Sequence, residues 1–334
     1  MDIHLYDEEE APDVTTGAEA AVAAVEQTTE PSKETPVHDR RGYLGGSDAA
    51  VIAGLSPWKT PYQLYLEKIG KEKPADLSDN ERVYWGQILE AVVAHEYGRR
   101  TGRKIRRVNK LLMHNEHPFI AAHIDRDVLN ESRILEIKTA GRGTDWGEEE
   151  TDEIPPHYYA QVQHYLAVTG ADVCDVAVLI GGQQYRQYEV PRDDEYIAAL
   201  IKLELDFWEH VQSEDPPTPE TSAEANEMWP TTTGGIVYGD ATTIRAAQDL
   251  YDVTAKIKDL EAQKDHLETQ LKAAMEDIGD TLVAGKTKLA TWKPQESRRF
   301  DSKAFAADNP ELYERYRKPQ VTRVFRLSYK PGKE

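Results

Sequence analysis

The sequence predicts an α/β protein with a central mixed sheet flanked by helices. Strand-like apolar segments at 172–180 and 184–190 stand between helical patterns at 156–168 and 193–211, and strands that alternate with helices are typical of a mixed α/β domain. In addition, 39% of the 334 residues are apolar, which is enough for at least one well-buried core.

The elements before this region are predicted from their own boundaries. A Gly-Gly turn precedes a first short helix, Pro61 opens a second helix that ends at Gly70, and Gly102 follows the end of a longer third helix. Strand-like segments come next. In chain order, the predicted elements are helices to 53, over 61–70 and over 79–100, and strands over 110–114, 120–129 and 133–139.

The two ends of the chain differ from this central region. Residues 1–37 hold ten acidic residues and one basic residue, and they lack large apolar side chains at a helical period. A disordered acidic tail is therefore expected over 1–38. A folded α/β domain is expected over 39–214, followed by a linker over 215–240 that is rich in Pro, Thr and Gly, and by a C-terminal module over 241–334.

The C-terminal module begins with a pattern that is typical of a coiled coil. Apolar residues recur at alternating spacings of three and four, with Lys264 in one seam position and Gly279 as the stop. The apolar seam residues are Leu250, Val253, Ile257, Leu260, Leu267, Leu271, Ala274 and Ile278. Strand-like segments over 281–292 and 321–329, around short helices that start near Asp301 and Pro310, predict a small α+β module.

The composition excludes several classes of site. The lone Cys174 lies in the apolar run 173–180, where a buried side chain is expected, and one cysteine excludes a disulfide framework, a four-cysteine zinc site and an iron–sulfur cluster. The sequence has no basic leader and no run of about 18 apolar residues, so a cytoplasmic protein without membrane association is expected. The net charge of −20 argues against a uniformly basic surface, but basic residues concentrate over 99–110 and 286–330, which allows local phosphate binding.

Two carboxylates and a lysine carry the predicted chemistry. Residues two apart in a strand share a face, so Glu136 and Lys138 point the same way, and Asp125 on a neighbouring strand can lie opposite Glu136. These carboxylates, together with the backbone carbonyl of Ile137, suit a hard cation that takes oxygen ligands. Such a cation favours hydrolysis of a phosphodiester by activated water, which Lys138 can orient. A surface ion pair between Glu136 and Lys138 is the alternative.

Four segments in order carry a resemblance to a known family, and together they cover about 40–212. They are Arg40 to Asp48 (RRGYLGGSD), Trp85 to Glu96 (WGQILEAVVAHE), His117 to Lys138 (HPFIAAHIDRDVLNESRILEIK) and Ile154 to Gly170 (IPPHYYAQVQHYLAVTG). The chain resembles the PD-(D/E)XK nuclease superfamily, and more closely the YqaJ-type viral recombinases related to lambda exonuclease. The resemblance implies a restriction-endonuclease-like core with catalytic Asp125, Glu136 and Lys138.

The same resemblance implies that Asp125, Glu136 and, from the preceding helix, Glu90 hold the metal. The chain departs from the family pattern at one point, because Arg126 stands where many relatives have a glycine after the catalytic aspartate. A second acid, Asp127, follows it and shares a face with Asp125 in a regular strand, but the resemblance favours Asp125 as the ligand.

Two further pairs are implied as site residues. Gln161 and Tyr165 match the Q-h-x-x-Y pattern of the exonuclease relatives, and positions i and i+4 share a helix face. They are expected to act in catalysis or DNA positioning, although Tyr165 is equally explained as a core aromatic residue. Arg40 and Ser47 reproduce the spacing with which relatives bind a terminal 5′ phosphate, and the glycines at 45–46 allow close approach of an anion. A plain helix N-cap is the alternative for Ser47.

The resemblance thus predicts a phage-type DNA exonuclease that depends on Mg²⁺ or Mn²⁺, with two ions, and digests linear duplex ends 5′→3′ to leave 3′ overhangs. Expected partners are double-stranded DNA ends, a single-strand annealing recombinase and further copies of the chain. A restriction-like or structure-specific endonuclease with the same site is one alternative. A noncatalytic DNA-binding recombination scaffold is another, and the intact Asp125, Glu136 and Lys138 argue against it.

Overall fold

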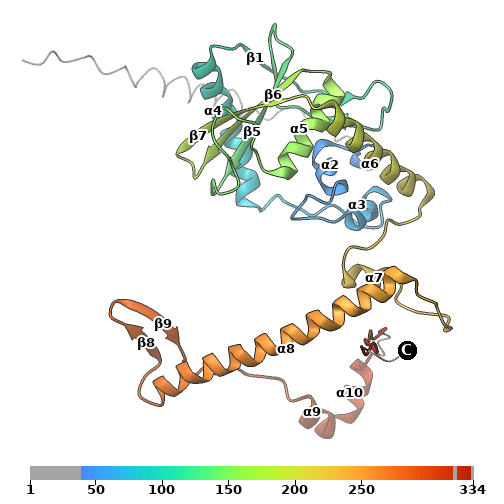
Figure 1. Cartoon of the computed structure of the whole chain (residues 1–334), viewed down its shortest axis with the longest axis vertical. Coiled ribbons are helices and arrows are strands. Elements are labelled where there is room, and N and C mark those ends of the chain that lie inside the picture. The colour runs from blue at the N-terminus through green and yellow to red at the C-terminus, as the bar shows by residue number, and fades with distance from the viewer. Residues whose placement is uncertain (1–38, 319–321, 332–334) are drawn as a thin grey trace, which may run out of the picture. The chain divides into compact units, whose positions relative to one another are not determined.

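The computed structural model describes residues 39–318 and 322–331, which form two compact units divided between Glu220 and Thr221 (Figure 1). The predicted acidic tail over 1–38 lies outside the described residues. In the first unit the elements are η1 (Arg40–Gly42), α2 (Gly46–Ile52), α3 (Pro61–Lys68), α4 (Glu81–Thr101), β1 (Ile105–Arg107), β2 (Leu112–Met113), β3 (Ala121–Ala122), β4 (Arg126–Val128), β5 (Arg133–Ala140), α5 (Pro156–Thr169), β6 (Val173–Ile180), β7 (Gln184–Pro191) and α6 (Asp194–Ser213).

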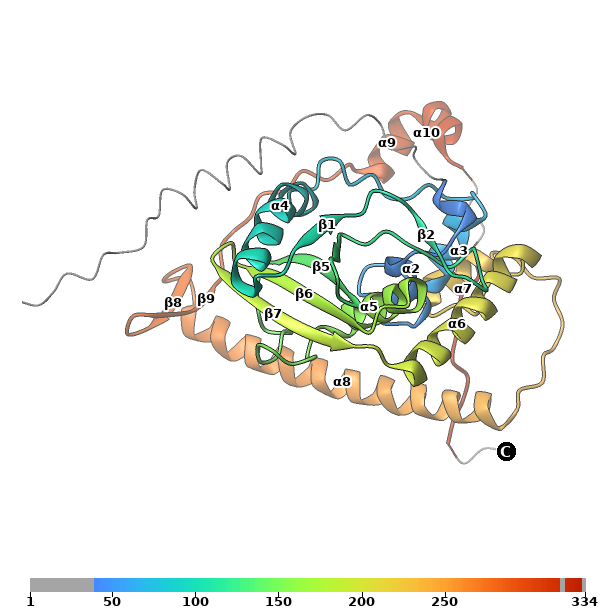
Figure 2. The same ribbon diagram turned by 90° about the horizontal axis from the view of Figure 1, so that it is seen from above.

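A five-stranded mixed sheet organises the first unit, with the order β1-β4-β5-β6-β7 (Figure 2). Strands β5 and β6 are parallel, and every other neighbouring pair in this sheet is antiparallel. The parallel pair requires a crossover connection, which α5 supplies. The prediction of an α/β fold with a central mixed sheet flanked by helices is therefore confirmed.

The two faces of the sheet are covered by different helices, because successive side chains of a strand point to opposite faces. Leu135 and Ile137 of β5 pack with Val93 and Tyr97 of α4 in one cluster. On the other face, Ile134 packs in a larger cluster that includes residues of α5, β6 and the start of α6. Cys174 is fully buried in this second cluster, as its position in an apolar run predicts.

The helices of the first unit begin and end where their residues satisfy the free backbone groups. Asn80 accepts hydrogen bonds from the backbone N–H groups of Arg82 and Val83 at the start of α4, and the carboxylate of Asp193 does the same for Tyr196 in α6. Gly102 and Gly170 follow α4 and α5 with positive φ angles of 70° and 72°, a conformation that favours glycine.

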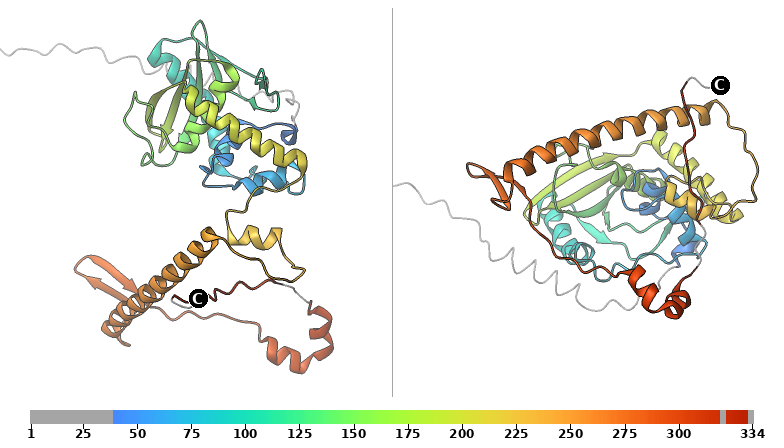
Figure 3. Two further views of the ribbon diagram at one scale, coloured as in Figure 1. Left: turned by 45° about the vertical axis from the view of Figure 1, so that its right-hand side comes forward. Right: turned by 90° about the horizontal axis from the view of Figure 1, so that it is seen from below.

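The second unit consists of α7 (Ser222–Met228), α8 (Ala241–Met275), β8 (Thr281–Ala284), β9 (Thr287–Thr291), α9 (Ser302–Asp308) and α10 (Pro310–Tyr316). Helix α8 is one continuous helix of 35 residues, as every view shows (Figures 1 and 3). The large apolar residues of the predicted seam that lie within the helix are exposed to solvent, with fractions from 40% at Leu250 to 62% at Leu260, and Ile278 lies beyond the end of the helix. Strands β8 and β9 form an antiparallel hairpin.

The structure differs from the predicted elements in a few places. The predicted strand over 120–129 is two short strands, β3 and β4, because they pair with different partners, β2 and β1. Strand β1 and helix α7 were not predicted. The predicted strand over 321–329 is wrong for 322–329, because no strand pairs with this segment in the described structure. Within the described residues, no helix is long and apolar enough to span a membrane.

Candidate active site

Strand β5 presents Glu136 and Lys138 toward α5. Its neighbours Leu135 and Ile137 pack on the α4 side of the sheet, so the alternation of side chains places Glu136 and Lys138 on the opposite face. Both side chains are largely withdrawn from solvent, with exposed fractions of 5% for Glu136 and 17% for Lys138. A surface ion pair, the alternative for these two residues, does not describe this arrangement.

Four of the predicted site residues form one hydrogen-bonded cluster. The Lys138 ammonium Nζ donates to Glu136 Oε1 at 2.6 Å and to Gln161 Oε1 at 3.2 Å. The Gln161 amide Nε2 donates to Glu136 Oε1 at 3.1 Å and to the Tyr165 hydroxyl at 2.7 Å. Both the oxygen and the nitrogen of the Gln161 amide thus have hydrogen-bond partners, which a polar side chain on the inner face of α5 requires.

The ionisation of this cluster follows from its partners. Burial alone would lower the pKa of Lys138, but the carboxylate of Glu136 and the charge of Asp125 raise it above its usual value, so Lys138 stays an ammonium at neutral pH. Burial and the nearby charge of Glu136 raise the pKa of Tyr165 well above its usual value. The Tyr165 hydroxyl therefore stays protonated, and it serves as a hydrogen-bonding group rather than a base.

Asp125 lies one residue before β4, next to Glu136 across the sheet. The antiparallel register pairs Arg126 with Leu135, and its extension by one residue sets Asp125 opposite Glu136. The Asp125 carboxylate Oδ2 accepts a hydrogen bond of 2.8 Å from the backbone N–H of Ile137. Burial, together with the charges of Glu136 and Glu90, raises the pKa of Asp125 well above its usual value. The carboxylates of Asp125, Glu136 and Glu90 therefore lie close enough together to repel one another.

Glu90, the third predicted metal ligand, is held by an arginine. Its Oε1 lies 2.6 Å from Nη1 of Arg126, and the same nitrogen donates to the backbone carbonyl of Asp125 at 2.8 Å. Arg126 is itself buried, with 7% of its surface exposed. The residue that departs from the family pattern therefore connects Glu90 of α4 to the turn that carries Asp125.

The chemistry of the donor set fits a hard divalent cation. Asp125, Glu136 and the backbone carbonyl of Ile137 offer only oxygen atoms, which Mg²⁺ and Mn²⁺ prefer. Among the described residues, no three His, Cys, Asp or Glu side chains already form a group that could hold a metal ion. Glu90 faces Arg126, so its metal role stays a prediction. The alternative ligand Asp127 pairs instead with Arg106 of β1, at 2.6 Å.

Arg40 of η1 and Ser47 in the first turn of α2 lie together. The Arg40 Nη2 donates to Ser47 Oγ at 3.0 Å and lies 3.6 Å from Asp48 Oδ1. Asp48 also accepts a hydrogen bond of 3.0 Å from the backbone N–H of Gly45 and lies 2.8 Å from the buried ammonium of Lys68. Although burial raises it, the charges of Lys68 and Arg40 bring the pKa of Asp48 below its ordinary value.

Gly46, the first residue of α2, lies directly against α5. A Cβ atom on Gly46 would overlap the ring of Tyr165 and would lie 3.0 Å from Cγ of Gln161. The backbone at Gly46 therefore rests directly on the two predicted site residues of α5. Helix α2 packs against α5 along the same contact. The predicted phosphate-binding pair and the hydrogen-bonded cluster thus belong to one continuous packing unit.

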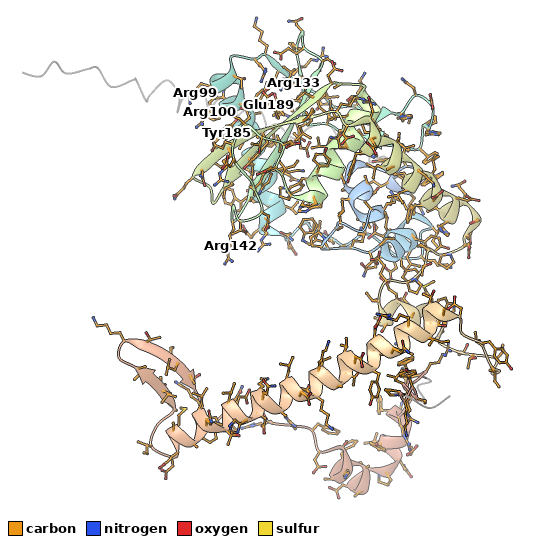
Figure 4. All side chains as sticks on the ribbon, viewed as in Figure 1. Arg99, Arg100, Arg133, Arg142, Tyr185 and Glu189 are labelled. Carbon is orange, nitrogen blue, oxygen red and sulfur yellow. The ribbon has the colours of Figure 1, made fainter. Side chains whose placement is uncertain are left out.

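The basic run over 99–110 is largely occupied by ion pairs within the chain. Arg99 and Arg100 both pair with Glu96, at 2.7 and 2.6 Å, and Arg100 lies over the ring of Tyr185 at 4.4 Å. Figure 4 shows these side chains gathered at one end of α4 and β7, away from Arg142. Arg103 and Arg106 pair with acidic residues of the sheet, Asp175 and Asp127. Much of this run is therefore structural rather than free for phosphate.

Several residues of the site were not predicted. The Lys68 ammonium donates to the carboxylate of Asp48, which lies 20 positions earlier in the sequence. The sequence did not predict this contact, because a lysine in the last turn of a helix is usually exposed. Arg126 was noted only as a departure from a pattern. Trp58 was not singled out, although a tryptophan between two prolines is a recognisable feature of the sequence.

Comparison with known proteins identifies a family. Residues 37–172 match the model of the YqaJ-like viral recombinase domain. The chain is 36% identical to protein YqaJ of Bacillus subtilis strain 168 over 307 residues, which cover 90% of this chain and 95% of that protein. It is 28% identical to protein R354 of Acanthamoeba polyphaga mimivirus over 166 residues, which cover 46% of this chain and 30% of that protein.

Solved structures of two exonucleases show a limited similarity to this chain. An alkaline exonuclease, LHK-Exo from Laribacter hongkongensis, matches with a TM-score of 0.43 and 21% identity over 52% of this chain and 90% of that one. A phage-related exonuclease from Haemophilus somnus 129PT matches with a TM-score of 0.39 and 15% identity over 52% of this chain and 96% of that one.

Proposed function

Because this chain belongs to the family of YqaJ-like viral recombinases, we propose that it is a metal-dependent deoxyribonuclease that digests linear duplex DNA from an end. The observation that carries the proposal is the buried cluster in which Lys138, Glu136 and Gln161 are joined by hydrogen bonds beside Asp125. An ammonium and two carboxylates in this arrangement suit hydrolysis of a phosphodiester.

Asp125, Glu136 and the carbonyl of Ile137 would hold one of two Mg²⁺ or Mn²⁺ ions, with Glu90 as a further ligand once it leaves Arg126. When bound, such ions supply the positive charge that favours deprotonation of water and offsets charge on the phosphate. Lys138 remains protonated, so its ammonium can hold the attacking water or a phosphate oxygen. Gln161 keeps Lys138 and Glu136 in place through its two hydrogen-bonding ends.

End recognition is assigned to η1 and the first turn of α2. Arg40 and the Ser47 hydroxyl would bind a terminal 5′ phosphate, and this assignment is supported by their mutual hydrogen bond of 3.0 Å on an exposed surface. Lys68 neutralises Asp48, which would otherwise repel the phosphate. Binding of the 5′ end gives digestion in the 5′→3′ direction and leaves a 3′ overhang. A single-strand annealing recombinase would take up that overhang.

Self-association through α8 is part of the proposal, with a second copy of the chain as the partner. Lys256 and Glu261 flank the exposed seam, and neither has an ion-pair partner among the described residues. Their spacing of five residues lets Lys256 of one helix meet Glu261 of another in a parallel two-stranded coil. Replacement of Leu260 by lysine is expected to lower the molecular mass measured by sedimentation equilibrium, whereas replacement of Arg245, on the outer face, is not.

The proposed activity is tested on 5′-phosphorylated linear duplex DNA with Mg²⁺ or Mn²⁺. Glu136→Gln and Lys138→Ala should each abolish release of nucleotides, while Glu195→Gln, at an exposed position of α6, should match the wild type. Equal rates for the wild type and the two site variants would exclude this active site. A parallel assay on covalently closed circular duplex separates the alternatives, because an endonuclease cuts circles and an exonuclease leaves them intact.

A further inference from the structure

An exposed tryptophan lies at the end of a chain of ring contacts that starts at the catalytic lysine. The Lys138 ammonium lies 4.7 Å from the ring centroid of Tyr158. The Tyr158 ring contacts His157, with centroids 4.1 Å apart, and the His157 ring meets Trp58 edge to face, with centroids 5.0 Å apart. Trp58 itself is 71% exposed. The indole thus stands in solvent and is connected to the Lys138 ammonium through the rings of Tyr158 and His157.

The loop between α2 and α3 holds this indole in a fixed position. Pro57 restricts the backbone before Trp58, and the Trp58 backbone N–H donates to Ser56 Oγ at 3.3 Å. On the other side, the Lys59 ammonium pairs with Glu67 of α3 at 2.6 Å. Thr60 then caps α3, and Pro61 opens it. A loop anchored on both sides presents a large apolar ring without folding it into the core.

The surroundings of Trp58 suit an uncharged aromatic ligand. Burial and the nearby charge of Lys138 lower the pKa of His157, so its ring is neutral at pH 7 and adds no charge to the surface. The contact between His157 and Trp58 is perpendicular, so it covers at most one face of the indole. A flat ring with a free face offers stacking to a nucleobase, and stacking tolerates every base because each has a π face.

We propose that Trp58 is a stacking platform for an unpaired nucleobase at the DNA end, next to the site of hydrolysis. The inference rests on the proposed nuclease function and specifies how the site receives its strand. Bases inside a duplex are stacked on both sides, so only a terminal or separated base can present a face to the indole. The net charge of −20 limits phosphate attraction over the protein as a whole, which gives a single stacking contact more weight.

Binding is measured without metal, so that no hydrolysis intervenes. Short single strands carry 2-aminopurine at the terminal nucleotide, at the 5′ end in one strand and at the 3′ end in another. The wild type and Trp58→Phe should quench the 2-aminopurine fluorescence, because both keep a ring that can stack. Trp58→Ala should lose the quenching and bind about 5- to 150-fold more weakly, the effect expected for the loss of one base stack.

The matched control is Trp229→Ala, which removes another half-exposed tryptophan from the second unit. It should bind and quench as the wild type does. If Trp58→Ala binds and quenches like the wild type, the platform is excluded. Since Trp58 is mostly exposed, Trp58→Ala should keep the wild-type circular dichroism spectrum. If it does not fold, the same binding measurement is made with Trp58→Leu, which keeps an apolar side chain but has no ring to stack.

A second measurement separates this inference from the proposed function. On linear duplex with Mg²⁺, Trp58→Ala should slow digestion of fully paired ends more than digestion of ends with two mismatched terminal pairs, because mismatched bases are already separated. Equal slowing on both substrates would exclude a role in receiving an unpaired base. If the wild type digests neither substrate, the nuclease proposal fails, while the metal-free binding assay still decides whether Trp58 stacks a base.

Discussion

The replacement of Lys68 by methionine should destabilise the protein strongly. The Lys68 ammonium lies 2.8 Å from Asp48 Oδ2 and donates to the backbone carbonyls of Arg40 and Tyr43, at 2.7 and 2.5 Å. Only 4% of its side chain and 7% of that of Asp48 is exposed. Methionine fills a similar volume but leaves the buried carboxylate with the exposed Arg40, 3.6 Å away, as its remaining cationic neighbour. Breaking a buried ion pair in this way costs about 3–5 kcal/mol of the free energy of unfolding.

A matched control uses the other lysine pair of the same region. Lys59 and Glu67 are more exposed, at 31% and 15%, so Lys59→Met should cost less than about 1 kcal/mol. The double variant Asp48→Asn with Lys68→Met removes the stranded charge and should recover much of the loss. Urea unfolding, followed by circular dichroism and tryptophan fluorescence, measures all of these differences in the free energy of unfolding.

The pH dependence gives a further check on Lys68. The pKa of Asp48 is lowered in the folded protein, so its stabilising contribution is present above the unfolded pKa and is lost as the pH falls through the folded value. In Lys68→Met the penalty comes from the charged form of Asp48, so the gap to the wild type should narrow in acid. If Lys68→Met unfolds within about 1 kcal/mol of Lys59→Met at neutral pH, the reasoning about this buried pair is refuted.

Two other predictions concern the packing around α5. Burial alone would lower the pKa of His164, but Glu204, 2.6 Å away, raises it above its usual value. The stabilising contribution of His164 is therefore complete below the unfolded pKa of 6.5 and is lost as the pH rises through the folded value. The free energy of unfolding of His164→Gln should vary less with pH from 6 upward than that of the wild type, and an unchanged pH profile would contradict this. Gly46→Ala should cost about 1–3 kcal/mol of stability and reduce hydrolysis, because its Cβ overlaps Tyr165, while Gly42→Ala, with nothing within 4 Å, should match the wild type.

The local features of the fold could be predicted because each depends on few residues. The alternation in β5 was sufficient to place Glu136 and Lys138 on one face, and the proline and glycine signals gave the ends of α3 and α4. The single strand predicted over 120–129 is instead two strands, β3 and β4, because the choice of pairing partner is a property of the whole sheet. Short β1 has three residues and too little pattern to detect.

The candidate site shows the same limit. Gln161 could be predicted to need polar partners, since it lies on the inner face of an amphipathic helix, and it has them in Glu136, Lys138 and Tyr165. The pairing of Arg126 with Glu90 could not be predicted, because it joins positions 36 residues apart through side chains whose direction depends on how α4 crosses the sheet. Contacts of this kind depend on tertiary packing, which local sequence patterns do not encode.

The contact between Gly46 and Tyr165 has a consequence for where DNA would be cut. The backbone at Gly46, next to the predicted phosphate-binding Ser47, rests directly on the buried ring of Tyr165 and on the side chain of Gln161, so this segment has no room to shift toward α5. In the proposed nuclease, the separation between the captured terminal phosphate and the hydrolysed bond is therefore set by rigid packing. Such a protein would measure a fixed number of nucleotides from the end, and the length of each product would be independent of the base sequence.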